Sequence, residues 1–244
     1  MNRTEIYEKY RWPRRRPART VLRGLTSMAF AALTNLHVEG AENFPKEGPL
    51  LVVANHFNFA DPALMIRITP WPLEMIGGHI MPNAPRQIWW IARSYGFIPV
   101  YRGTGRREAL LAGETVLKSG GVLGVFPEGV SDVAFLREAR PGVAYIATQA
   151  ECPILPMGFD GLPNIFPRLR KAKRTNITVR VGKPFGPFKK AEVKGAERRK
   201  YLDSVGHQIM QRIAELIPPE QRGVYSQDPI IRQTAMANTA AWPF

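Results

Sequence analysis

The chain has 244 residues, 45% of them hydrophobic and 22% charged, which is enough to enclose one sizeable hydrophobic core. Its single cysteine excludes an intrachain disulfide and a cysteine-rich zinc module. No run reaches the roughly 18 uncharged apolar residues that a membrane-spanning helix needs. The 34 Lys and Arg residues outnumber the 20 Asp and Glu residues, giving a net charge of +14. Such a charge favours an anionic partner: nucleic acid, acidic lipid or a phosphorylated substrate.

The N-terminal segment combines basic charge with a short apolar helix. Eight of the first 23 residues are Lys or Arg. Apolar residues recur at helical spacing over 21–36, and residues 24–36 carry no charge, which is too short a run to span a bilayer. Basic side chains beside a short amphipathic helix are the composition of an interfacial anchor. Residues 1–37 are therefore predicted to contact an anionic membrane surface, with a core-packing helix and a basic tail as the alternative.

Beyond this segment, short apolar runs alternate with helical patterns. The apolar runs predict strands at 50–54, 73–76, 97–101, 122–126, 154–159 and 177–181. Helical spacing predicts helices at 62–69, 85–95, 106–119, 143–150 and 202–216. Strands that alternate with helices predict an α/β domain over 38–217, with a mixed, largely parallel central sheet flanked by helices. Residues 218–244 are expected to form a loose C-terminal tail.

Polar residues follow two of the predicted strands, 50–54 and 122–126. In open parallel sheets, ligands bind beyond the carboxyl ends of the strands. After the first strand come His56 and Asp61, a candidate pair in which the carboxylate holds one ring nitrogen and the other nitrogen acts as a base on a substrate hydroxyl. On spacing alone, an Asp61 that caps its helix and an ordinary loop histidine are favoured over this pair.

Four blocks in order resemble the glycerolipid acyltransferase family, which includes the lysophosphatidate and glycerol-3-phosphate acyltransferases. The blocks are Asn55-His56-x4-Asp61, the segment from Gly96 to Arg102, Phe126-Pro127-Glu128-Gly129 and the segment from Cys152 to Pro156. Each block alone is a weak signal, whereas the four in order are specific. The resemblance covers residues from about 38 to 181.

The resemblance implies an O-acyltransferase that needs no cofactor and takes its acyl group from a thioester on coenzyme A or acyl carrier protein. His56 is then the general base, with Asp61 as its partner. The acceptor is a lysophospholipid, most directly 1-acylglycerol-3-phosphate, whose acylation gives phosphatidic acid. The resemblance assigns the acceptor to Phe126, Pro127, Glu128 and Gly129, and its phosphate to Arg102 and Arg140. A protein of this kind is expected at the cytoplasmic face of the membrane, as a peripheral or monotopic protein.

The chain departs from the family pattern at the phosphate pocket. Val130, Ser131 and Asp132 stand where the family usually has Thr-Arg-Ser, so an expected cation is missing. Another acceptor therefore stays open: a different lysolipid, a glycolipid or a hydroxylated pigment. A basic nucleic-acid or membrane-surface binding module without catalysis is a remote alternative. No nucleic-acid partner is expected, because the basic stretch at 168–200 lacks the interleaved aromatic side chains that stack on bases. A family member without catalysis is disfavoured, because the His-x4-Asp pair is intact.

Overall fold

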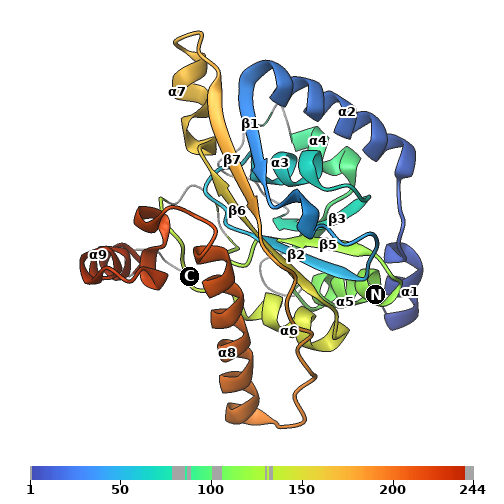
Figure 1. Ribbon diagram of the computed structural model, residues 1–244. Coiled ribbons are helices and arrows are strands. Elements are labelled where there is room, and N and C mark those ends of the chain that lie inside the picture. The colour runs from blue at the N-terminus through green and yellow to red at the C-terminus, as the bar shows by residue number, and fades with distance from the viewer. Residues whose placement is uncertain are drawn as a thin grey trace.

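A seven-stranded sheet forms the centre of the fold, with helices on both of its faces (Figure 1). The computed structural model describes residues 2–78, 86, 89–100, 106–129, 131 and 134–239. The strands are β1 (Thr34–Glu39), β2 (Leu50–Ala54), β3 (Leu73–Gly78), β4 (Ile98–Val100), β5 (Val122–Val125), β6 (Ile154–Asp160) and β7 (Thr175–Val181). Their order across the sheet is β1-β7-β6-β2-β5-β3-β4.

The sheet is mixed and mostly parallel, as the sequence predicted. β2 pairs in parallel with β5 and β6, β5 with β3, and β3 with β4. β7 is antiparallel to β6 and parallel to β1, so these two strands run against the rest. Every residue of β2 is buried, because helices cover both faces of this central strand.

Two apolar cores lie on opposite faces of the sheet. Leu51 and Val53 of β2 enter one core, and Leu50 and Val52 enter the other, as the alternation of side chains in a strand requires. Buried residues of α1 (Arg3–Tyr10), α5 (Arg106–Lys118), α6 (Pro141–Ala150) and α8 (Gly195–Ala214) belong to the first core. Buried residues of α2 (Arg16–Leu33), α3 (Asp61–Ile68) and α4 (Trp89–Tyr95) belong to the second. None of the helices in the described ranges combines the length and apolarity needed to cross a bilayer.

The N-terminal segment differs from the expected basic tail with one helix. Residues 3–10 form α1, whose first turn is capped by Asn2, and its Ile6 and Tyr10 are buried. α2 ends at Leu33, and the residues that follow form the edge strand β1, which pairs with β7. The predicted boundary at residue 37 therefore falls inside a strand. The edge strand escaped prediction because only alternate residues face the core.

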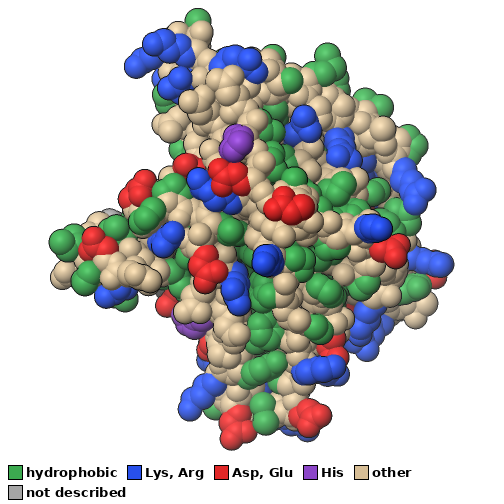
Figure 2. Space-filling view, in the orientation of Figure 1, with side chains coloured by type: hydrophobic (Ala, Val, Ile, Leu, Met, Phe, Trp, Pro, Cys, Tyr) green, Lys and Arg blue, Asp and Glu red, His purple; other side chains and the backbone are tan. Residues whose placement is uncertain are grey.

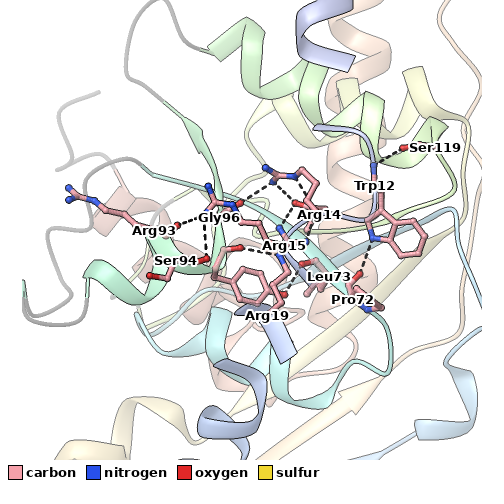
Figure 3. Close-up of polar contacts among 12 residues, drawn as sticks. Trp12, Arg14, Arg15, Arg19, Pro72, Leu73, Arg93, Ser94, Gly96 and Ser119 are labelled. Atoms are coloured by element: carbon pink, nitrogen blue, oxygen red, sulfur yellow. Dashed lines mark hydrogen bonds and ion pairs between the residues drawn. The ribbon is translucent and has the colours of Figure 1, made fainter. Parts of the chain in front are cut away.

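Arginines of the N-terminal segment dock on β3 and α4 (Figure 3). Arg14 Nη2 lies 2.5 Å from Glu74 Oε2, and Arg19 Nη2 lies 2.7 Å from the same oxygen. Arg15 donates to the carbonyls of Arg93 and Ser94 at 3.0 and 3.3 Å. Arg19 and Glu74 are buried, so this ion cluster is part of the interior rather than a solvated surface. These contacts hold the start of α2 against the sheet.

Residues 218–244 were expected to form a loose tail, but the described part, 218–239, contains helical structure. Two 3-10 turns, Pro219–Gln221 and Gly223–Tyr225, precede α9 (Pro229–Thr239). Gly223 has φ +52°, and a Cβ there would meet the backbone of Leu136. The Leu136 N–H in turn donates to the Gln221 carbonyl at 2.8 Å. Backbone contacts anchor this segment. Because such contacts need no apolar stripe, the sequence pattern did not predict them.

Candidate active site

The carboxyl end of β2 carries His56 and Asp61 in direct contact. His56 Nδ1 lies 3.0 Å from Asp61 Oδ2, and the same oxygen accepts the Asn58 N–H at 2.8 Å. Asn58 Oδ1 accepts the Ala60 N–H at 2.9 Å, and the backbone carbonyl of Asn58 accepts the Asp61 N–H at 3.1 Å. These bonds close the loop into a tight turn, which brings together two side chains that a continuous helix would hold apart.

Asp61 does not cap its helix through its side chain. It is the first residue of α3, Ala60 occupies the capping position, and that position makes no side-chain cap. The Asp61 carboxylate instead turns back to His56. Burial raises the pKa of Asp61, against the opposite pull of His56 and of the backbone N–H of Asn58. The carboxylate is 1% exposed, so its interaction with His56 is only weakly screened by solvent.

The His56 ring is fixed on a second side by Phe126. The two rings stack with centroids 4.3 Å apart and an interplanar angle of 22°. His56 is 16% exposed, which leaves part of the ring open to a ligand. Because Asp61 holds Nδ1, Nε2 is the nitrogen available to a substrate.

Glu128 links the loop after β2 to the loop after β5. Its Oε1 accepts the His56 N–H at 2.8 Å, and its Oε2 accepts the Arg137 N–H at 3.2 Å. The side chain is buried, and burial raises the pKa of Glu128 to about 8, although the two N–H groups pull it downward. The resemblance assigned Glu128 to the acceptor. In the structure both carboxylate oxygens are engaged by backbone, one of them by the backbone of His56.

The rest of this block packs around the same link. The Pro127 carbonyl accepts the Arg140 N–H at 2.8 Å, and the Gly129 N–H donates to the Phe126 carbonyl at 3.1 Å. Gly129 has φ +68°, and a Cβ there would lie 3.1 Å from Arg140 Cγ. Arg140 occupies the N-cap position of α6. The structure thus brings Arg140, Gly129 and Phe126 to the same end of the sheet as His56.

Arg102, assigned to the acceptor phosphate, lies outside the described residues. Val130 and Asp132, two of the three residues that depart from the family pattern, also lie outside them. The phosphate contact therefore stays a prediction.

Asn55 has a structural part in the site that sequence reasoning missed. Its Nδ2 donates to the Phe159 carbonyl at 2.9 Å, and the Phe159 N–H donates to its Oδ1 at 2.7 Å. The amide is buried and joins the ends of β2 and β6 immediately before His56. The only signal in the sequence is an asparagine at the end of an apolar run, where a buried polar side chain needs a partner.

No metal site or reactive thiol accompanies these residues in the described part of the chain. Nowhere in the described ranges do three or more His, Cys, Asp or Glu side chains gather as metal ligands could. Cys152 is buried, and burial raises its pKa to about 11, so it is a thiol at neutral pH and a poor nucleophile.

Comparisons with known proteins point to one family. The acyltransferase family model matches residues 35–160. The chain is 29% identical over 132 residues to 1-acyl-sn-glycerol-3-phosphate acyltransferase alpha of Ovis aries, covering 50% of the chain and 44% of that protein. It is 28% identical over 173 residues to an uncharacterized protein of Mycobacterium tuberculosis, covering 63% of the chain and 45% of that protein. The chain spans about half the length of the curated relatives it matches.

A solved structure shares the fold. The 1-acyl-sn-glycerophosphate acyltransferase of Thermotoga maritima superposes with a TM-score of 0.56 at 21% identity, over 94% of this chain and 83% of that one.

Proposed function

The chain belongs to the acyltransferase family, and we propose that it transfers an acyl group from a thioester on coenzyme A or acyl carrier protein to the hydroxyl of a lysophospholipid. The favoured acceptor is 1-acylglycerol-3-phosphate, giving phosphatidic acid. The observation that carries the proposal is the contact of His56 Nδ1 with Asp61 Oδ2 at 3.0 Å, at the carboxyl end of β2. The names of the matched relatives support the choice of acceptor.

The mechanism uses His56 twice. Asp61 keeps the proton of the neutral ring on Nδ1, so Nε2 takes the proton of the acceptor hydroxyl as that oxygen attacks the thioester carbonyl. The tetrahedral intermediate then expels the thiolate, which receives the proton from Nε2. The products are an ester and a free thiol, and no acyl-enzyme forms. The buried Asp61 carboxylate stabilises the imidazolium between the two steps.

A different acceptor is the second candidate, and one observation favours it. Val130, Ser131 and Asp132 replace the Thr-Arg-Ser that the family usually carries, which removes a cation and adds an acid. Another lysolipid, a glycolipid or a hydroxylated pigment requires the same base and the same donor. The acceptor without a phosphate is thus an alternative within the same chemistry.

We also propose that α2 attaches the enzyme to the cytoplasmic face of a membrane, as a peripheral or monotopic protein. Val21, Leu25 and Met28 are 62%, 54% and 70% exposed and follow one another at helical spacing. On the other side of the helix, Leu22 and Phe30 are buried in the core. A helix with an apolar stripe toward solvent fits the interfacial layer of a bilayer.

One experiment tests the reaction and the acceptor together. Purified protein is incubated with acyl-CoA and a panel of phosphorylated and neutral lysolipids, and kcat/KM is measured for each. We expect lysophosphatidate to be the best acceptor. Arg102→Ala should lower kcat/KM for it by about tenfold to a hundredfold, because a charge-assisted hydrogen bond contributes roughly 1.5–3 kcal/mol. The KM of the donor should not change, and Arg102→Lys should restore activity only in part.

Arg107→Ala is the matched control, because Arg107 is an exposed arginine on the first turn of α5. Equal kcat/KM for phosphorylated and neutral acceptors, unchanged in Arg102→Ala, would refute lysophosphatidate and leave acyl transfer in place. Transfer to none of the acceptors, with either thioester donor, would refute the proposed function as a whole.

A further inference from the structure

The connection between β6 and β7 carries basic residues and no acidic ones. It contains α7 (Ile165–Leu169) and a tight turn in which Ala172 has φ +51°. Residues 163–174, called here the basic hairpin, hold five cationic side chains: Arg168, Arg170, Lys171, Lys173 and Arg174. Figure 2 shows Lys and Arg side chains gathered at this tip, over α7 and the start of β7. The hairpin therefore presents a concentrated positive charge at one extremity of the molecule.

Two of these arginines fix the hairpin in place. Arg168 Nε donates to the Arg174 carbonyl at 2.8 Å, across the turn. The Arg174 guanidinium donates to the carbonyls of Ala31 and Thr34, at the C-terminal end of α2. A cation at this end of a helix also meets the negative end of the helix dipole. The other three cationic side chains, those of Arg170, Lys171 and Lys173, remain exposed at the tip.

The basic hairpin lies next to the C-terminal end of α2, the helix that carries the apolar stripe. The contact of Arg174 with the end of α2 joins the two elements, and both lie along the upper edge of the molecule in Figure 1. The helix that carries the stripe of Val21, Leu25 and Met28 thus ends against the cationic hairpin. Apolar side chains flanked by Lys and Arg match the two layers of an anionic leaflet, its acyl boundary and its phosphates.

The basic hairpin also contacts the loop that carries the catalytic pair. Phe166 is 44% exposed, and its ring stacks on Phe59 with centroids 5.5 Å apart and an interplanar angle of 20°. Phe59 lies between His56 and Asp61 in the sequence. A lipid surface that binds the hairpin is therefore brought beside the catalytic loop.

We propose that the basic hairpin is a second membrane contact, in which Arg170, Lys171 and Lys173 bind the phosphates of anionic lipids. With α2 it defines two points of attachment, so the orientation of the catalytic loop toward the leaflet is fixed. The proposal goes beyond the proposed reaction, and lipid binding requires no acyl transfer. A failure of one can therefore be told from a failure of the other.

Vesicle sedimentation of the full chain tests this proposal without donor or acceptor. The vesicles are phosphatidylcholine alone, or phosphatidylcholine with roughly one-third phosphatidylglycerol. The variant Arg170→Gln/Lys171→Gln/Lys173→Gln keeps Arg168 and Arg174, which hold the hairpin together. Each basic side chain near an anionic leaflet raises the binding constant by up to about fivefold. The three substitutions together should therefore weaken binding to the anionic vesicles about tenfold to a hundredfold. Binding to phosphatidylcholine alone should be unchanged.

The matched control is Lys194→Gln/Arg199→Gln/Lys200→Gln. It removes the same charge from exposed residues around the start of α8, which lies at the opposite end of the molecule from α7 (Figure 1). This control should bind anionic vesicles much as the unaltered chain does. Wild-type binding by the hairpin variant, or an equal loss in the control, would overturn the proposal, since binding would then not depend on the hairpin.

A site-directed label provides a second measurement that leaves most of the charge in place. Cys152 is the only cysteine and is buried, so Lys171→Cys can be labelled selectively with a polarity-sensitive fluorophore. On anionic vesicles the label at position 171 should become protected from an aqueous quencher, whereas a label on Lys200→Cys should stay accessible. Equal accessibility of the two labels on vesicles would overturn the proposal.

Discussion

Glu128→Gln tests how His56, the proposed general base, is held. The carboxylate of Glu128 is 1% exposed, and its two oxygens accept the N–H groups of His56 and Arg137. Both oxygens of a carboxyl group can accept, whether it is ionised or protonated, whereas glutamine keeps the shape of the side chain but has only one acceptor atom in its amide. Its nitrogen then faces one of the two N–H donors, which loses its partner. A buried polar group without a partner costs roughly 1–3 kcal/mol, so the free energy of unfolding should fall by about that amount.

Kinetics and denaturant unfolding together separate two roles for Glu128. If Glu128 positions His56, kcat falls, the acceptor KM changes little and stability falls. If Glu128 instead binds the acceptor, the KM of the acceptor rises while stability is unchanged. That result would refute the role of Glu128 in positioning His56. Glu151→Gln is the matched control: Glu151 also accepts a backbone N–H, from Lys190 at 3.0 Å, but it is exposed. Its substitution should leave both turnover and unfolding near wild type.

The difference in stability between the wild type and Glu128→Gln should depend on pH. Burial raises the pKa of Glu128 from 4.5 to about 8 in the folded protein. Between these values the folded protein holds a proton that the unfolded chain releases, so the contribution of Glu128 to stability falls as pH rises. The stability of the wild type relative to Glu128→Gln should therefore decrease from about pH 4.5 to about pH 8. A difference that does not vary with pH would contradict the raised pKa.

The His56–Asp61 pair and the buried ion cluster give the remaining predictions. His56→Ala should lower kcat about 10³-fold with normal folding, since general base catalysis supplies roughly 10²–10⁴; near-normal turnover would remove His56 from the mechanism. Asp61→Asn should lower kcat about 10²-fold or more, because an amide can favour the wrong ring tautomer, and an unchanged pH–rate profile would argue against this role. Glu74→Gln should lower the free energy of unfolding by about 3–5 kcal/mol, because Arg19 stays buried without its carboxylate. Glu39→Gln, which removes a partly exposed pair with Arg180, is its near-neutral control.

The central sheet was predictable from the sequence because of where its strands lie. β2, β5 and β6 are covered on both faces, and the sequences of such strands are nearly continuous apolar runs. The order of strands across the sheet was not predictable. β1 pairs with β7, which lies far along the chain, and no one-dimensional pattern records that partnership.

The missed elements are short or mostly exposed. α1 buries only Ile6 and Tyr10, and α7 buries only Ile165, so neither shows a helical apolar stripe. α8 begins at Gly195 rather than at residue 202, because its first two turns face solvent and are polar. Apolar periodicity detects a helix only where the helix packs.

The site was predictable in its residue types and not in its hydrogen bonds. The four-block resemblance paired His56 with Asp61, whereas spacing alone favoured a helix cap and a loop histidine, because the contact depends on the turn that Asn58 closes. The partners of Glu128 are backbone N–H groups, which no pattern of side chains reveals. Functional geometry of this kind becomes visible only when the loops after two different strands are placed together.

Several N-terminal arginines make contacts inside the protein, which the net charge of the chain does not reveal. Arg14 and Arg19 bind Glu74 in the interior, and Arg15 binds backbone carbonyls at the end of α4 (Figure 3). Arg19 is buried and Arg14 is half-buried, so these two add less to membrane attraction than exposed side chains would, whereas Arg15 stays exposed. Their effect is to fix α2 against β3 and α4, on the sheet that also carries the catalytic loop.

A fixed α2 bears directly on the proposed reaction with lipids. Its apolar stripe then points in one direction relative to His56, and the contact of Arg174 with the end of α2 holds the basic hairpin in the same frame. A flexible basic tail would raise the concentration of enzyme at a membrane without setting its orientation. If α2 and the basic hairpin both contact the membrane as proposed, they set both, and an acceptor confined to the leaflet would meet His56, the proposed base, in a restricted geometry. Loss of the Glu74 cluster should therefore reduce activity on lipid in vesicles more than activity on the same lipid dispersed in detergent.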